Sequence, residues 1–126
     1  AHARILGGVY AIPNVYVNVK GYMSNSVPVD AYRGAGRPEA AYVIERAMDQ
    51  AARELGLAPD EFRRINFVRP EQMPYQHPFG FVFDSGEFER NMEDAKRNPK
   101  WATVGERKAA SRARGKARGI GMAYYI

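Results

Sequence analysis

The sequence has 126 residues, of which 45% are hydrophobic and 26% charged, a length that suits one domain with a modest core. No apolar run is long enough to span a bilayer, and the absence of cysteine excludes disulfides, a thiolate nucleophile and cysteine-bound metal clusters within this chain. The formal net charge of +5 arises from six cations between residues 107 and 118, because removing these six leaves −1. The basic character is therefore one local face.

The first predicted element is a strand over residues 15–23. Apolar and polar side chains alternate there, which is the period of a strand, and β-branched residues are common. One face carries Val15, Val17 and Val19, and the other carries Tyr16, Asn18 and Lys20. A polar break at residues 24–26 ends this strand, and an extended segment then leads into a glycine loop.

Gly34 and Gly36 bracket Ala35 in this loop, and we expect positive φ there because only glycine adopts it at low cost. Pro38 fits the first turn of a helix that Gly56 should end. The helical period places one set of residues inward (Ala41, Ile44, Met48, Ala51, Leu55) and another outward (Glu45, Asp49, Arg53). A glycine turn between Arg33 and Arg37 at a helix N-terminus has the layout of an anion site.

The remaining elements are mostly helical. A second helix should begin near Pro59, with Phe62 and Ile65 inward, and residues 69–83 should form a long ordered loop rich in proline. Asp84 and Glu87 are predicted to form a capping box at the start of a third helix, and Phe83 is predicted to pack against Phe88 as a hydrophobic staple. The inward face of this helix should carry Phe88, Met92 and Ala95. A fourth helix is expected over 101–116 and a strand from 119 to 126. The predicted class is α+β, with about four helices on a small sheet.

Several motifs carry a resemblance to a known family. They are VPVDAYRGAGRPEA at 27–40, IPNV at 12–15, NFV at 66–68, MPYQ at 73–76, FDSGEF at 83–88 and RGIG at 118–121. In this order they resemble the large, molybdopterin-binding subunits of the molybdenum hydroxylases, which include carbon monoxide dehydrogenase, aldehyde oxidoreductase and xanthine dehydrogenase proteins. The resemblance covers nearly the whole chain.

The resemblance implies roles for three residues of the glycine loop. Arg33 and Gly34 would bind the molybdopterin cofactor, and Ala35 would line the substrate pocket. Gly34 stands where carbon monoxide dehydrogenases carry a copper-binding cysteine, and Ala35 stands where xanthine dehydrogenases place an aromatic residue. Both departures argue against a molybdenum–copper centre and a purine-like substrate. From the residues alone, the alternative role for Arg33 is an ion pair with Asp30 or Glu39.

The resemblance also implies a longer parent. Residues 1–126 would be a single-domain fragment of an oxidoreductase that hydroxylates an aldehyde, an N-heterocycle or a similar small substrate, or that is like carbon monoxide dehydrogenase. We expect no catalytic residue here, because Glu106 lies too far from the family's position for its catalytic glutamate, and we expect the fragment alone to be inactive. Iron–sulfur clusters and FAD would lie on partner domains or subunits. The composition is typical of a cytoplasmic protein.

Two alternatives concern other residues. A non-catalytic basic domain could bind nucleic acid or an acidic partner through residues 107–118, although no aromatic residues interleave with these cations to stack on bases. His77 and His2 have no carboxylate or histidine companions at metal-ligand spacing, so we expect no metal site.

Overall fold

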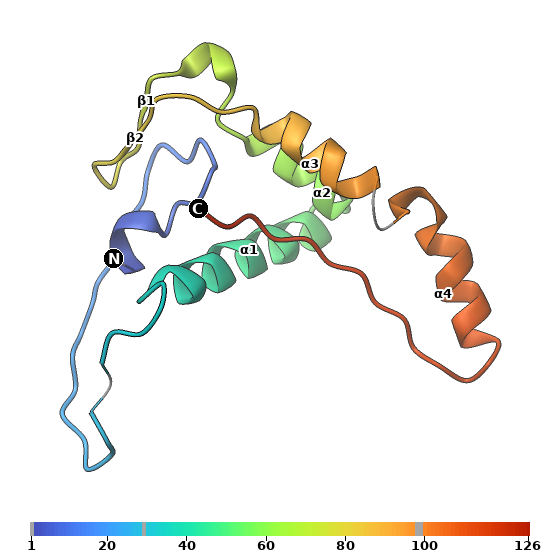
Figure 1. Cartoon of the computed structure of the whole chain (residues 1–126), viewed down its shortest axis with the longest axis horizontal. Helices are drawn as coiled ribbons and strands as arrows, with labels where there is room; N and C mark the ends of the chain where they lie inside the picture. Colours follow the sequence, from blue (N-terminus) through green and yellow to red (C-terminus); the bar gives the residue numbers. More distant parts are fainter. Residues whose placement is uncertain (1, 29, 98–99) are drawn as a thin grey trace.

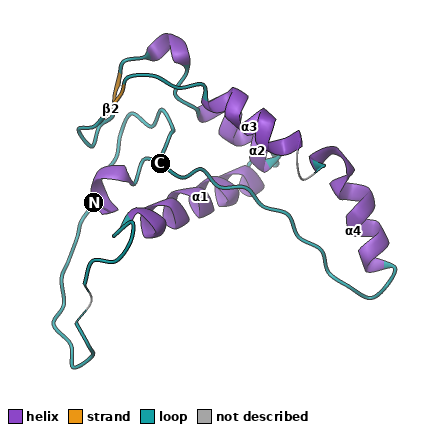
Figure 2. Cartoon of the chain, in the orientation of Figure 1, coloured by secondary structure: helices purple, strands orange, loops and turns teal. Residues whose placement is uncertain are grey.

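The computed structural model describes residues 2–28, 30–97 and 100–126. These residues form four α-helices, three short 3-10 helices and a two-stranded sheet (Figures 1 and 2). The elements in order are η1 (His2–Ile5), α1 (Arg37–Glu54), α2 (Pro59–Asn66), η2 (Pro70–Gln72), β1 (Tyr75–Gln76), β2 (Val82–Phe83), α3 (Phe88–Arg97), η3 (Trp101–Thr103) and α4 (Val104–Arg112). The predicted α+β class is confirmed.

The sheet lies where the sequence predicted a long loop. Strands β1 and β2 pair antiparallel, with Tyr75 opposite Phe83 and Gln76 opposite Val82. The strands predicted over 15–23 and 119–126 do not form, because neither segment has a strand partner within the described residues. The alternation within the first segment is still visible, since Val15 and Val17 are half-buried while Tyr16 and Asn18 are exposed.

The core joins the two ends of the chain to the middle. Residues 9–11 run antiparallel to residues 66–68, through bonds from Ala11 N to Asn66 O (2.8 Å) and from Val68 N to Val9 O (3.0 Å). A cluster of buried hydrophobic side chains forms this core: Val9, Tyr10, Met48, Phe67 and Met92. The C-terminal segment crosses α1 to reach this core (Figure 1), where Tyr124 packs edge-on against Phe67 with 5.0 Å between ring centroids.

Helix α1 ends as the sequence predicted. Gly56 has a φ of 69° and donates to Arg53 O, while Leu57 N donates to Ala52 O at 2.9 Å. These two bonds form a Schellman motif, which satisfies the last helical carbonyls. The predicted inner face is only partly right, because Met48 is buried but Leu55 is 64% exposed.

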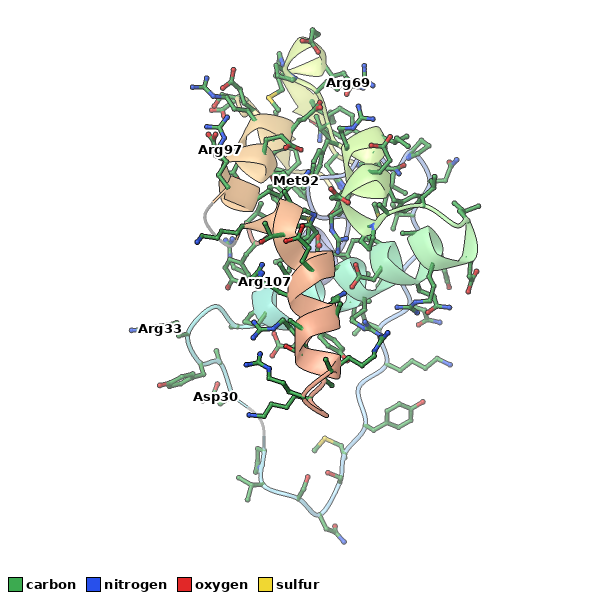
Figure 3. The ribbon with its side chains drawn as sticks, turned by 90° about the vertical axis from the view of Figure 1, so that its right-hand side faces the viewer. Asp30, Arg33, Arg69, Met92, Arg97 and Arg107 are labelled. Atoms are coloured by element: carbon green, nitrogen blue, oxygen red, sulfur yellow. The ribbon has the colours of Figure 1, made fainter. Side chains whose placement is uncertain are left out.

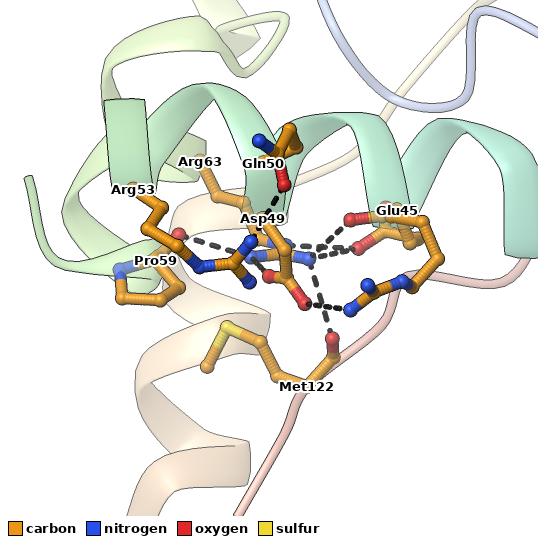
Figure 4. A network of polar contacts seen from close by, with 8 residues as sticks. Glu45, Asp49, Gln50, Arg53, Pro59, Arg63 and Met122 are labelled. Carbon is orange, nitrogen blue, oxygen red and sulfur yellow. Dashed lines mark hydrogen bonds and ion pairs between the residues drawn. The ribbon is translucent and has the colours of Figure 1, made fainter. Parts of the chain in front are cut away.

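The outward placement of Glu45 and Asp49 is wrong, and Arg63 of α2 is the reason. Its buried guanidinium donates to Glu45 Oε2 and Asp49 Oδ1, each at 2.8 Å, and to the carbonyls of Pro59, Glu45 and Met122 (Figure 4). Tyr10 Oη donates to Glu45 Oε1 at 2.6 Å. These bonds compensate for burying the charges.

The pKa values of this cluster follow from its burial and charge. Burial alone would lower the pKa of Arg63, but the carboxylates of Asp49 and Glu45 raise it above the ordinary value. Burial raises the pKa of the Tyr10 hydroxyl, and its bond to Glu45 raises it further. Arg63 is therefore a cation in this cluster, and the Tyr10 hydroxyl is neutral.

The shorter helices differ from prediction at their ends. Helix α3 begins at Phe88, so the capping box at Asp84 is wrong, although Phe83 and Phe88 do pack with 5.3 Å between ring centroids. On α3 Met92 is buried and Ala95 is exposed, and on α2 Ile65 is 52% exposed although it was expected inward. The predicted helix over 101–116 is η3 followed by α4, which ends at Arg112.

Two further findings concern the limits of these elements. The predicted stop at residues 98–99 lies outside the described residues. None of the described helices is both long enough and apolar enough to cross a bilayer.

Candidate functional site

The glycine loop forms a tight double turn before α1. Gly34 has a φ of 79° and Gly36 a φ of 86°, which confirms the expectation that both glycines adopt the left-handed region. Ala35 N donates to Tyr32 O and Arg37 N donates to Gly34 O, both at 2.8 Å. These bonds hold the chain in a shape that residues with a Cβ rarely adopt.

The loop leaves the N-terminus of α1 open. Gly36 is the N-cap residue and, being glycine, has no side chain that could cap the first turn. A hollow of about 530 Å³ lies there, lined by Asp30, Ala31, Tyr32, Arg33, Ala35, Gly36, Pro38 and Glu39. The positive end of the helix dipole therefore faces a hollow large enough for a ligand.

Arg33 and Gly34 both present hydrogen-bond donors that have no partner within the described residues. The Arg33 side chain extends into solvent, away from Asp30 (Figure 3). Within the described residues it has no carboxylate within 4 Å, so the alternative ion pair with Asp30 or Glu39 is not formed. The N–H of Gly34 likewise has no hydrogen-bond partner among the described residues. A guanidinium and a free N–H beside a helix N-terminus suit an anionic or oxygen-rich group.

The C-terminal segment contacts the glycine loop and the first residue of α1. Arg37 Nη1 donates to Ile126 O at 3.0 Å, although 89 residues separate the two. A Cβ added to Gly34 would lie 2.9 Å from Tyr125 Oη and 3.3 Å from Pro38 Cδ. A side chain at position 34 would therefore have a strained φ and would require Tyr125 to shift. Nothing in the sequence spacing pointed to Tyr125.

Ala35 lies on the outer surface of the turn. Its side chain is exposed and lines the hollow together with Arg33. A methyl group leaves space in the hollow but offers no aromatic face on which a flat ligand could stack.

His77 is buried in an aromatic setting. Its ring stacks on Phe81 with 4.4 Å between centroids, and its Nδ1 accepts a bond from Phe79 N at 3.2 Å. The ring lies against Gly7, where a Cβ would approach Nε2 to 2.0 Å, and Nε2 has no partner in the described chain. Burial lowers the pKa of His77. Among the described residues, no three histidine, cysteine or acidic residues converge as metal ligands.

The residues of the other sequence hypotheses lie away from the loop. Glu106 is exposed in the first turn of α4. The basic face surrounds a hollow of about 430 Å³ lined by Lys108, Arg112, Gly115, Lys116, Ala117 and Arg118. In this part of the structure no aromatic side chain lines that hollow, so it lacks the stacking surface of a nucleic-acid groove.

Comparison with known proteins shows what this chain resembles. The family model of the molybdopterin cofactor-binding domain matches residues 1–67. The carbon monoxide dehydrogenase large chain of Hydrogenophaga pseudoflava is 41% identical over 78% of this chain and 13% of its own length. The 6-hydroxypseudooxynicotine dehydrogenase complex subunit gamma of Paenarthrobacter nicotinovorans is 32% identical over 95% of this chain and 16% of its own.

Solved structures give the same picture. Quinoline 2-oxidoreductase from Pseudomonas putida 86 matches with a TM-score of 0.76 and 31% identity, over 90% of this chain and 14% of its own. A Cu,Mo-CO dehydrogenase matches with a TM-score of 0.62 and 32% identity, over 72% of this chain and 12% of its own. The chain thus spans between 12% and 16% of the length of these relatives.

Proposed function

Because the chain belongs to the molybdopterin cofactor-binding domain family, we propose that it is part of the molybdopterin-binding subunit of a molybdenum hydroxylase. In this proposal the turn at Gly34 lies against the cofactor. The observation that carries it is the hollow at the start of α1, where donors of Arg33 and Gly34 that have no partner among the described residues meet the positive end of the helix dipole. The matched residues 1–67 contain this whole site.

The loop fits an anionic cofactor with several oxygen atoms. Arg33 would pair with its charged part through the guanidinium, and Gly34 would donate its backbone N–H at short range because no side chain intervenes. Ala35 would leave room for the substrate on the exposed side of the turn. The molybdenum cofactor, when bound, supplies the redox centre at which a carbon atom of the substrate is hydroxylated with oxygen from water.

The substrate we propose is an aldehyde or an N-heterocycle. A copper ion held by a thiolate does not fit this loop, because the chain has no cysteine and Tyr125 Oη occupies the space beside Gly34. Ala35 cannot stack on a purine. The first observation argues against the reaction of the copper-containing relative and the second against a purine, which leaves other small carbon substrates with a C–H bond to be oxidised.

The rest of the enzyme would lie outside these residues. Residues 1–126 would be one domain of the large subunit, and the catalytic base would come from another part of it. Relatives named large chain or subunit gamma of a complex support assembly with companion subunits. Iron–sulfur clusters and FAD on those companions would carry the electrons away, in the cytoplasm. The nucleic-acid alternative gains no support from the family match or from the basic hollow.

The test is Arg33→Ala in the full-length subunit, expressed with molybdenum. Arg33 makes no ion pair within the described chain, so the thermal midpoint should not change. Losing one charged hydrogen bond of about 1.5–3 kcal/mol should weaken cofactor retention roughly tenfold or more. Metal analysis after dialysis measures the molybdenum per polypeptide.

The matched control is Arg112→Ala, another exposed arginine that has no carboxylate within 4 Å in the described structure. It should keep its molybdenum. If Arg33→Ala retains as much molybdenum and turnover as the wild type, the cofactor role of the loop is wrong.

A further inference from the structure

Residues 13–28, here named the arm, project from the body of the molecule and return toward α1 (Figures 1 and 3). The arm contains large apolar side chains that the described structure leaves in solvent. Tyr16, Val19, Tyr22, Met23 and Val27 are each between 72% and 103% exposed. Single exposed apolar residues are ordinary, but five within twelve residues indicate an interaction surface, and three of them, Val19, Met23 and Val27, share one face at the period of a strand.

The composition of the arm is that of a covered segment. Lys20 is its single charged residue among sixteen, whereas 26% of the whole chain is charged. A segment that is exposed to solvent on both sides should contain about the same fraction of charged residues as the whole chain. The helices α2, α3 and α4 do contain several charged residues each. The arm instead has the alternating apolar pattern of a strand that packs on one face.

The backbone of the arm is also unpaired. Within the described structure no backbone hydrogen bond involves residues 13–28, and the segment has no strand partner. Extended backbone with free N–H and C=O groups next to apolar side chains is a template for pairing with another strand.

We infer that the remainder of the same polypeptide pairs with the arm as a β-strand and buries its Val15–Val17–Val19 face. This inference rests on the proposed function, because it takes the chain to be part of a longer subunit. The match to quinoline 2-oxidoreductase covers 90% of this chain within 14% of one longer chain. The nearest source of covering strands is therefore the same polypeptide.

Covering the arm has a consequence for the proposed site. The arm runs directly into the turn of Tyr32 and Gly34, whose far side is held by Arg37 and the C-terminal segment. A docked arm would fix the near side of the turn, so both ends of the loop would be held before the cofactor binds. The arm is thus a positioning element for Arg33 and Gly34.

The test is hydrogen exchange on the full-length subunit, purified alone and with its companion subunits. We expect amides of residues 15–23 in the subunit alone to exchange at least about a hundredfold more slowly than in unstructured peptide, at every protein concentration. Exchange at the unstructured rate would overturn the inference. So would protection that requires companion subunits, or protection that rises with concentration and thus reports a second copy.

Two variants of neighbouring residues identify the covered face. Val19→Lys places a charge on the apolar face, and Asn18→Lys places the same charge on the opposite face. We expect Val19→Lys to lose protection over 15–23 and to lower molybdenum per polypeptide severalfold, while Asn18→Lys keeps both. Equal losses in the two variants would overturn the assignment of the covered face.

The wild-type experiment separates this inference from the proposed function. A full-length subunit with a protected arm but without molybdenum would overturn the proposed function and leave the covered arm standing. A subunit that holds molybdenum while its arm exchanges freely would overturn the covered arm alone.

Discussion

The middle and the N-terminal end of α1 treat their polar groups in opposite ways. In the middle, Glu45 and Asp49 turn toward Arg63, and each N–H of that guanidinium is directed to an acceptor (Figure 4). At the N-terminus, Arg33 points into solvent and the N–H of Gly34 has no partner in the described chain. Both regions are charged and lie on one helix or directly before it.

The difference separates stability from binding. A buried charge must be paired within the fold, because leaving it unpaired costs several kcal/mol. An exposed donor costs little while water solvates it, and it is then available to a ligand. We therefore expect substitutions in the Arg63 cluster to act on folding and substitutions in the glycine loop to act on the cofactor.

The largest expected effect is on stability, from Arg63→Met. It leaves the buried carboxylate of Glu45 without its cation, while Asp49 keeps only the more distant Arg46 at 3.8 Å. Breaking a buried pair in this way should lower the free energy of unfolding by about 3–5 kcal/mol. Urea unfolding of the full-length subunit, followed by fluorescence, measures the shift in midpoint.

Its control is Arg64→Met, one residue along the same helix. Arg64 is exposed and pairs with Glu61 and Glu89 at the surface, so its loss should cost less than about 1 kcal/mol. Equal effects of the two substitutions would show that the Arg63 cluster contributes no more than a surface ion pair.

Next in size is the effect of Gly34→Val on turnover. A side chain at Gly34 meets Tyr125 Oη at 2.9 Å and Pro38 Cδ at 3.3 Å, and the φ of 79° strains it, so the loop or Tyr125 must shift. A shift of about 1 Å at a reacting centre can cost roughly a hundredfold in rate, whereas backbone strain costs about 1–3 kcal/mol of stability. Activity per bound molybdenum in the full-length subunit is the quantity to compare.

Gly80→Val controls for backbone strain, because Gly80 has a similar φ of 85° and its added Cβ would touch nothing within 4 Å. Arg37→Ala should be milder than Gly34→Val, since it removes only the bond to Ile126 O. Near-normal turnover per molybdenum in Gly34→Val would mean that the loop is only a structural turn.

The part of the fold that the sequence predicted is the part that local rules decide. The glycine turn, α1 and its end at Gly56 each depend on residues a few positions apart, and all three are confirmed. Glu45 was misplaced because the helical period assigns a charge to the outside, and no local signal indicates that Arg63 neutralises it from 18 residues away. The family resemblance is also confirmed, and it too rested on short stretches of consecutive residues that can be recognised without the fold.

Only the part of the site that lies on one short stretch of sequence was predicted. Arg33, Gly34 and Ala35 were found from one loop, and their assignment to cofactor and substrate stays a prediction. Tyr125 and Ile126 reach the loop through the tertiary fold, so sequence spacing could not reveal them. The predicted strands over 15–23 and 119–126 failed because a strand depends on a partner that the pattern itself does not supply.

A smaller effect should come from His77, a buried group that the fold leaves partly unsatisfied. Burial lowers the pKa of His77 in the folded protein below the ordinary histidine pKa of 6.5. Below pH 6.5 the unfolded chain therefore binds a proton at this residue more readily than the folded protein does. Stability should therefore be full above about pH 6.5 and fall as the pH decreases, by at most about 1.4 kcal/mol per pH unit from this residue.

Urea midpoints between pH 7.5 and 5 measure this dependence in the wild type, in His77→Gln and in His2→Gln. His77→Gln should flatten the profile relative to the wild type, because glutamine does not titrate. If His2→Gln flattens it equally, the acid sensitivity does not come from His77.

The smallest expected effect tests whether the contact between Tyr125 and the glycine loop restricts position 34. Tyr125→Phe removes only the hydroxyl that lies 2.9 Å from a Cβ at position 34, and its ring is otherwise unchanged. Alone it should change activity per molybdenum less than about threefold, since Gly34 needs no space there.

Gly34→Ala alone should lose much more activity, because the added methyl group meets that hydroxyl and the φ is strained. In the double variant the nearest remaining neighbour is Pro38 Cδ at 3.3 Å, so part of the loss should be recovered. The coupling between the two substitutions then measures the steric contribution of Tyr125. If the effects simply add, the φ of 79° alone requires glycine at position 34, and Tyr125 does not restrict the loop.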